Sequence, residues 1–155
     1  MMHIKNILLI STDDTNRGVM VEAVMNRLFL ERGITDIKIQ SRGLVVLFPE
    51  PVNSKTAAVL ANNGISCSDY QSIQVTKEDF QDCDLVITMS EEQKNKVMEE
   101  YETLSLVYTL KELAGEQGEM LDPYGKDMID YEYCYREIER LAEKSLKNIV
   151  GGIEE

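Results

Sequence analysis

The sequence predicts an α/β fold in which a small, doubly wound sheet of four parallel strands carries helices on both faces. Short apolar segments alternate with segments of helical periodicity along the chain, which is the pattern of βαβ units on a parallel sheet. The length of 155 residues and the hydrophobic content of 43% fit one globular domain, which we expect to span residues 1–155. Sheets of this kind bind ligands at the carboxyl ends of their strands, so the loop after the first strand is the first candidate site.

The N-terminal half supplies the first strands and helices. We expect the first strand over residues 4–10, which are mostly Ile and Leu. Apolar residues recur at helical spacing over residues 18–32, and Gly33 follows as the helix C-cap. Alternating apolar residues predict a short second strand over residues 37–41. A further helix is expected over residues 54–62, because a glycine lies shortly beyond its end.

The C-terminal half continues the alternation. Residues 76–79 have the pattern of a capping box, which marks a helix start. Residues 85–89 are continuously apolar apart from one Thr and predict a buried third strand. Ser90 and Gln93 form a second capping-box pattern, which predicts the start of the next helix. Residues 104–109 predict the fourth strand. After a glycine-containing loop, helical periodicity predicts a long helix over residues 128–150.

Composition excludes several classes of function. The net charge of −12 argues against a nucleic-acid partner, which usually needs a basic face. The longest apolar run is far shorter than the ~20 residues of a membrane helix, and the apolar stretch near the N-terminus is too short for a signal peptide. Three scattered cysteines form no metal or disulfide pattern, so we expect a reducing, cytoplasmic location. The single histidine, His3, stands too near the chain start for a triad, a zinc site or a phosphohistidine.

The loop between the first strand and the first helix has the features of an anion site. Residues 10–18 read Ile-Ser-Thr-Asp-Asp-Thr-Asn-Arg-Gly and lead into a helix N-terminus, where free N–H groups and the helix dipole favour an anion. Arg17 would donate two hydrogen bonds to an oxyanion. Asp13 and Asp14 act in the opposite direction, because each carboxylate would repel a phosphate dianion. A phosphate would therefore be held weakly if both carboxylates faced inward.

Further short motifs outside this loop are spread over most of the chain. They are residues 41–43 (Ser-Arg-Gly), 59–65, 76–79, 84–89 and 121–125 (Leu-Asp-Pro-Tyr-Gly). With the loop, they resemble in order the landmarks of the low-molecular-weight protein tyrosine phosphatase family, whose signature Cys-x-Gly-Asn-x-Cys-Arg-Ser joins a strand to a helix. The resemblance covers essentially the whole chain and implies a flavodoxin-like, four-stranded domain. Thr15 and residues 108–112 are similar to the bacterial branch that hydrolyses phosphoarginine.

The resemblance implies catalytic positions. In the family a Cys thiolate attacks phosphorus, an Arg binds the oxyanion, and the Asp of an Asp-Pro-Tyr-Gly turn protonates the leaving group. By position these roles fall on Ser11, Arg17 and Asp122. The remaining phosphate-loop positions are Thr12, Asp13, Asp14, Thr15, Asn16 and Gly18. Tyr70 and Ile73 stand where the family usually has His and Arg.

Ser11 is the central departure from the family signature. A thiol ionises readily beside cationic and helix-terminal groups, whereas an alcohol needs an adjacent general base. Four more positions depart from the signature, where Asp13, Asp14, Asn16 and Gly18 replace Gly, Asn, Cys and Ser. This number of changes in one loop favours natural divergence over a single introduced Cys→Ser exchange. Asp and Asn tolerate positive φ, so we expect the loop to keep its shape.

We therefore expect a phosphatase fold that keeps Arg17 and Asp122 but has lost its nucleophile. Such a protein would act as a binding or regulatory protein, and its partner would be a phosphorylated protein or a small anionic ligand. No cofactor, no nucleic acid and no membrane is expected to take part. The expected oligomeric state is a monomer or a weak dimer.

Two alternatives remain open at this point. The first is an active phosphatase of phosphotyrosine or phosphoarginine, either because Asp13, Asp14 and Asp122 converge on a divalent cation or because Ser11 replaces an original Cys. The second is a structural partner that uses residues 42–50 and the acidic surface.

Three other features are interpreted as structural. Cys134 and Arg140 repeat the Cys-x5-Arg spacing, but six residues of a predicted helix turn their side chains apart. Cys67 and Cys83 are interpreted as small apolar residues. The apolar run at residues 44–48 is expected to pack, with some exposed recognition surface beside the site.

Overall fold

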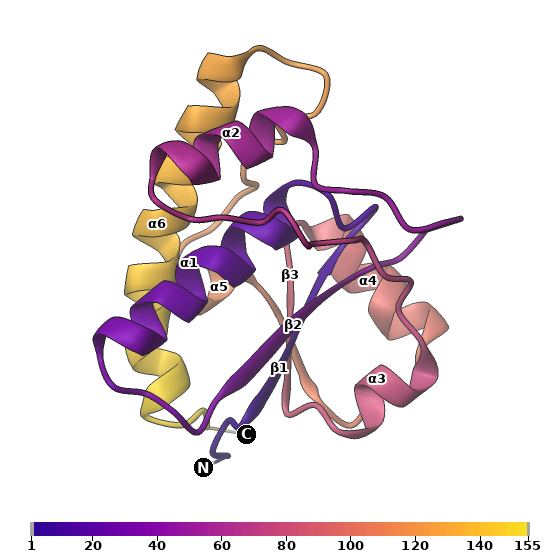
Figure 1. Cartoon of the computed structure of the whole chain (residues 1–155). Helices are drawn as coiled ribbons and strands as arrows, with labels where there is room; N and C mark the ends of the chain where they lie inside the picture. The colour runs from indigo at the N-terminus through magenta and orange to yellow at the C-terminus, as the bar shows by residue number, and fades with distance from the viewer. Residues whose placement is uncertain (1, 155) are drawn as a thin grey trace.

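Four parallel strands form a sheet in the order β2-β1-β3-β4 (Figure 1). The computed structural model describes residues 2–154 and defines β1 (Asn6–Ser11), β2 (Lys38–Gly43), β3 (Leu85–Thr88) and β4 (Leu106–Thr109). In the centre of the sheet, Leu9 pairs with Ser41 on one side and with Ile87 on the other. The strand order reverses between β1 and β3, which places a crevice at their carboxyl ends. The predicted doubly wound α/β fold is confirmed.

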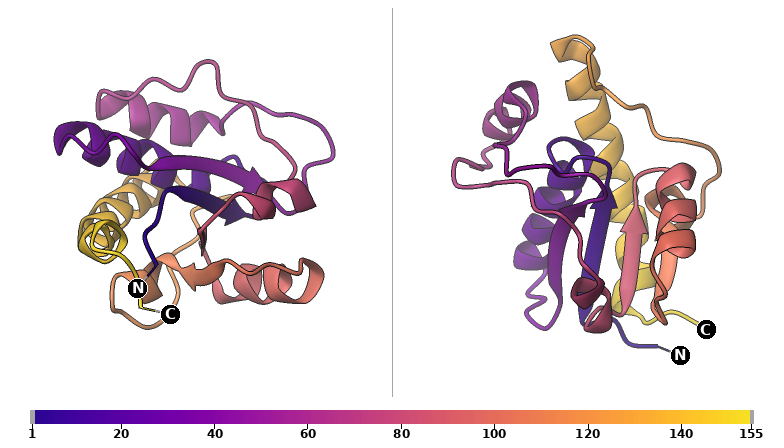
Figure 2. Two further views of the ribbon diagram at one scale, coloured as in Figure 1. Left: turned by 90° about the horizontal axis from the view of Figure 1, so that it is seen from below. Right: turned by 90° about the vertical axis from the view of Figure 1, so that its right-hand side faces the viewer.

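Helices cover both faces of the sheet (Figures 1 and 2). The bounds are α1 (Arg17–Glu31), α2 (Ser54–Asn62), α3 (Lys77–Gln81), α4 (Glu91–Glu100), α5 (Leu110–Leu113) and α6 (Met128–Val150). Side chains alternate along β1, so Ile7 and Leu9 join the core under α1 and α6, while Leu8 and Ile10 join a smaller core with residues of α3 and α4. Burial on both faces explains why this strand is continuously apolar.

Most expected elements occur near their predicted bounds. The helices predicted over residues 54–62 and 128–150 have those bounds, and the capping boxes at Thr76 and Ser90 both form. The fourth strand begins two residues later than expected, because Leu104 is fully exposed and precedes the paired segment. Sequence reasoning missed α5, although Thr109 forms the same kind of capping box at its start.

The apolar run at residues 44–48 combines packing with exposure, as expected. Leu44 is buried in the smaller core and donates its N–H to the carbonyl of Ser11 at 2.9 Å. Leu47 is 88% exposed and Phe48 is 65% exposed. The N–H groups of Val45 and Val46 also donate, to the carbonyl of Thr12 and to the side chain of Gln74, so the start of this loop is held in place and its end is open to solvent. None of the helices within residues 2–154 has the length and apolar character that crossing a membrane requires.

Candidate functional site

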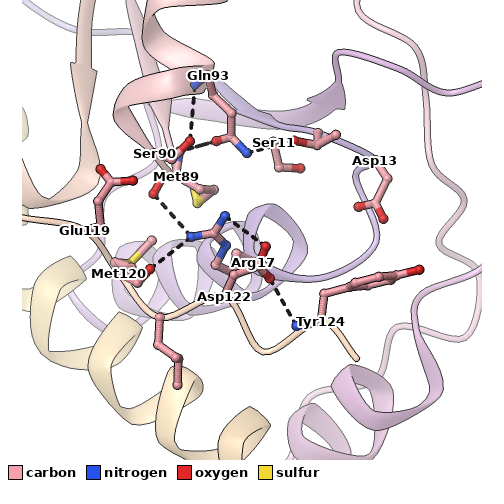
Figure 3. A network of polar contacts seen from close by, with 12 residues as sticks. Ser11, Asp13, Arg17, Met89, Ser90, Gln93, Glu119, Met120, Asp122 and Tyr124 are labelled. Atoms are coloured by element: carbon pink, nitrogen blue, oxygen red, sulfur yellow. Dashed lines mark hydrogen bonds and ion pairs between the residues drawn. The ribbon is translucent and has the colours of Figure 1, made fainter. Parts of the chain in front are cut away.

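A cavity of about 310 Å³ opens at the carboxyl end of β1, where the loop turns into α1. Its lining residues are Ser11, Thr12, Asp13, Asn16, Arg17, Gln93, Asp122 and Tyr124. Figure 3 shows side chains from the loop, from the start of α4 and from the 119–124 segment facing one another. The structure therefore brings Asp122 together with Ser11 and Arg17, the two other predicted catalytic positions, which lie more than 100 residues before it in sequence.

Ser11 ends β1 and lies at the buried side of this cavity. Its Oγ accepts a hydrogen bond from the backbone N–H of Asp14 at 3.2 Å. A Cβ atom at Gly18 would lie 3.0 Å from this Oγ, closer than side chains normally approach. The missing side chain at Gly18 thus leaves room around the Ser11 hydroxyl.

Arg17 begins α1 and is nearly buried. Its Nη1 points at the carbonyl oxygens of Met89, at 3.5 Å, and Met120, at 3.4 Å. Its Nη2 lies 3.6 Å from Oδ2 of Asp122 (Figure 3). The guanidinium is therefore oriented from one side by two backbone carbonyls, while its other edge faces the cavity and Asp122.

Asp122 stands at the mouth of the site, in the Asp-Pro-Tyr-Gly turn. Its side chain is 57% exposed, and its Oδ1 accepts the backbone N–H of Tyr124 at 3.1 Å. The turn closes with a hydrogen bond from the N–H of Lys126 to the carbonyl of Pro123, and Gly125 adopts a φ of 75° that favours glycine. The acidic side chain is thus held at the entrance of the cavity.

The carboxylates of Asp13 and Asp14 point in different directions. Asp13 lines the cavity, and its Oδ1 accepts the N–H of Thr15 at 3.2 Å. Asp14 has a φ of 62°, which agrees with the expectation that this loop position tolerates positive φ. Its side chain is fully buried away from the cavity, and its Oδ2 accepts the N–H of Ile73 at 3.0 Å.

The different directions of these two side chains contradict the alternative in which three aspartates bind a divalent cation. Asp13, Asp14 and Asp122 do not converge, and no group of three His, Cys, Asp or Glu side chains within residues 2–154 is arranged to hold a metal ion. The physical reason is that Asp14, at its positive φ, directs its carboxylate to the N–H of Ile73 and away from the cavity. Only one of the two loop carboxylates, that of Asp13, therefore lines the cavity.

Neighbouring elements hold the rest of the loop. The Oδ1 of Asn16 accepts a hydrogen bond from the hydroxyl of Thr56 in α2 at 2.8 Å. The Nε2 of Gln93 donates to the hydroxyl of Thr12 at 3.2 Å. Sequence reasoning recognised Gln93 only as a helix-capping residue, and it missed Tyr124 as part of the lining.

The cysteines do not supply a replacement thiolate. Burial raises the pKa of the Cys134 thiol to about 12, and its Sγ points at the carbonyl of Leu121. Arg140, the other half of the Cys-x5-Arg spacing, pairs with Glu116. Burial also raises the thiol pKa of Cys67 and Cys83, so all three cysteines favour the neutral form.

Comparison with known proteins gives a match over nearly the whole chain. The family model described as low molecular weight phosphotyrosine protein phosphatase matches residues 6–151. A curated relative, the low molecular weight protein-tyrosine-phosphatase PtpB of Staphylococcus aureus, is 26% identical over 144 residues. The match covers 93% of this chain and 98% of that relative.

Solved structures with the same fold include two that are informative. The low molecular weight protein tyrosine phosphatase from T. tengcongensis superposes with a TM-score of 0.87 and 27% identity, covering 96% of this chain and 99% of that chain. A YwlE arginine phosphatase superposes with a TM-score of 0.86 and 26% identity, covering 93% and 95%. That second protein is a Cys→Ser variant whose active-site serine is phosphorylated.

Proposed function

Because the chain belongs to the low molecular weight phosphotyrosine protein phosphatase family, we propose that its cavity binds the phosphoryl group of a phosphorylated protein. Ser11 in the nucleophile position makes it a binding or regulatory protein with impaired turnover. The partner is a protein that carries phosphotyrosine or phosphoarginine, or a small anion of the same chemistry. The site needs no cofactor, because binding uses the chain's own charges and N–H groups.

The orientation of Arg17 is the observation that carries this proposal. Its guanidinium is held by the carbonyls of Met89 and Met120 and faces a cavity that has the Ser11 hydroxyl at its buried side. An arginine fixed in this way donates two parallel hydrogen bonds to an oxyanion. The N-terminus of α1 adds N–H groups and the positive end of the helix dipole.

The environment of Ser11 supports impaired turnover. The hydrogen bond at its Oγ comes from the backbone N–H of Asp14, a donor that cannot take a proton from the hydroxyl. A thiolate attacks phosphorus without prior help, whereas an alcohol at this position is a weak nucleophile until a base removes its proton. Asp122 would still protonate a leaving group, but this step adds little to the rate when attack by the hydroxyl is slow.

A second candidate function is slow transfer of the phosphoryl group to Ser11. The phosphorylated serine of the YwlE variant favours it, since that serine stands in a similar fold. In this step a bond forms between Oγ and phosphorus, and the bond from phosphorus to the leaving oxygen or nitrogen breaks. The hydroxyl proton leaves through a phosphoryl oxygen to water, while a protonated Asp122 supplies the proton that the leaving atom takes. The product would be phosphoserine at Ser11, which hydrolyses only slowly.

The proposal also covers the compartment and the oligomeric state of the protein. We infer that it acts in the cytoplasm as a monomer or a weak dimer. The free cysteines Cys67, Cys83 and Cys134 suit a reducing compartment.

Hydrolysis of p-nitrophenyl phosphate and of a phosphoarginine peptide tests the proposal. We compare the chain with the Ser11→Cys variant, each with EDTA and with Mg²⁺. The expected result is little or no turnover by the chain and clear turnover by Ser11→Cys in both conditions. Multiple turnovers by the chain that disappear in Ser11→Ala would overturn impaired turnover and establish the active alternative. Turnover by neither protein would favour a structural role for the fold.

A further inference from the structure

The carboxyl group of Asp14 is buried with too few hydrogen-bond donors for a negative charge. Its side chain is 0% exposed, and Oδ2 accepts one hydrogen bond, from the N–H of Ile73 at 3.0 Å. Oδ1 is also out of contact with solvent and has no hydrogen-bond partner. Buried carboxylates normally accept two or three donors, because an unpaired buried charge is costly. The geometry therefore favours the neutral acid.

Among the described groups that act on the carboxyl of Asp14, Arg42 is the one cation, and the others are neutral or acidic. Tyr70 donates its hydroxyl to the Asp14 carbonyl at 3.1 Å and contacts the Ser41 hydroxyl at 2.7 Å. Glu22 of α1 faces the same cluster and accepts the N–H of Ser41 at 2.8 Å. The one cation, Arg42 of β2, is shared, since its Nε lies 3.6 Å from the carboxylate of Asp79.

The titration of these groups agrees with the geometry. Burial raises the pKa of Asp14, and the nearby hydroxyls of Tyr70 and Ser41 and the charge of Arg42 offset only part of this effect. Burial likewise raises the pKa of Glu22, and the neighbouring charge of Asp14 raises it further. Two carboxyls thus compete for one arginine that is already engaged.

Asp14 also lies close to the anion site, although it does not line the cavity. A Cβ at Gly18 would be 3.0 Å from the Oγ of Ser11 and 3.9 Å from the Oδ1 of Asp14. The two oxygens are therefore no more than about 7 Å apart. At this range, a charge on Asp14 would lower the affinity for a dianion about tenfold or more.

We propose that the fold holds Asp14 as a neutral acid, and that loss of this proton weakens anion binding in the neighbouring cavity. The inference rests on the proposed function, since it concerns the ligand of the same site. Asp14 touches no ligand and is a positioning residue that acts through its charge and through its hydrogen bond to Ile73. The protein would then bind phosphorylated partners more tightly at lower pH, over the range in which their phosphoryl groups stay dianionic.

Titration calorimetry with sulfate between pH 5.5 and 8.5 tests this inference, because sulfate remains a dianion across the range. For the chain, we expect the affinity to fall about tenfold or more as pH rises. Asp14→Asn keeps an acceptor for the N–H of Ile73 but cannot ionise, so its affinity should stay nearly constant. Asp13→Asn is the matched control, since it removes the adjacent carboxylate and should keep the pH dependence of the unaltered chain.

The outcomes separate the inference from the proposed function. Equal pH dependence in the chain and in Asp14→Asn would overturn the inference and leave sulfate binding intact. Failure of every protein to bind sulfate would instead contradict the proposed function. In that case, urea unfolding without ligand still shows whether Asp14 is protonated in the folded protein. Its raised pKa means that the chain should lose stability relative to Asp14→Asn as pH rises, and parallel stability curves would overturn the neutral acid.

Discussion

Replacing Arg17 by lysine separates the charge of the site from its geometry. The guanidinium is oriented by the carbonyls of Met89 and Met120, and its remaining N–H groups face the cavity. Lysine keeps the positive charge but presents a single ammonium group without the planar fork. Arg17→Lys should therefore lose one of two charge-assisted hydrogen bonds to an oxyanion, and Arg17→Ala should lose both.

The expected loss of sulfate affinity follows from the free energy that such hydrogen bonds contribute to binding. A hydrogen bond to a charged group contributes about 1.5–3 kcal/mol, so Arg17→Lys should weaken sulfate binding about 10- to 150-fold. Arg17→Ala should weaken it by more than about 100-fold. Asp122 is more than half exposed, so losing its arginine partner leaves no buried charge and should change stability little.

Titration calorimetry at about pH 6 measures these affinities, and urea unfolding checks that each variant is folded. Arg136→Ala is the matched control, because this arginine is exposed on α6 and lies outside the cavity. Sulfate affinity that is unchanged in Arg17→Ala would refute the assignment of the cavity as the anion site. Equal losses in Arg17→Lys and Arg17→Ala would show that the fork, and not the charge, dominates binding.

Three further changes have defined outcomes. In the Ser11→Cys background, Asp122→Asn should slow hydrolysis of a phosphotyrosine peptide about 100-fold or more, because an amide cannot protonate the leaving group; an unchanged rate would remove Asp122 from that role. Thr56→Val deletes a fully buried hydroxyl that donates to the loop, and urea unfolding should show a loss of about 1–3 kcal/mol. Leu9→Ala at the centre of the sheet should cost about 2–5 kcal/mol, whereas Leu104→Ala at a fully exposed position should change stability by less than about 0.5 kcal/mol.

Local signals account for the parts of the fold that the sequence predicted well. The helix over residues 128–150 has a long amphipathic repeat, and the capping pairs at Thr76 and Ser90 use side chains only three residues apart. The positive φ of Asp14 also follows from a local property, the tolerance of Asp for that conformation. Sequence patterns carry such information because every contact involved lies within one or two turns of chain.

Features that depend on distant contacts were beyond sequence reasoning. Asp14 turns away from the cavity because Ile73 offers an N–H to its carboxylate, 59 residues along the chain. Gln93 reaches the hydroxyl of Thr12 only because α4 packs beside the end of β1. The carbonyls that orient Arg17 have no signature in the sequence, since every residue has one.

Binding and turnover measured in the same sample test the central claim most directly. Phosphotyrosine and phosphoarginine peptides are titrated into the chain by calorimetry, with unphosphorylated peptides as controls, and released phosphate is counted afterwards. We expect saturable binding of a phosphorylated peptide that sulfate displaces, with less than one phosphate released per chain. Release of many phosphates per chain, or equal binding of the unphosphorylated peptides, would contradict a phosphoryl-binding protein with impaired turnover.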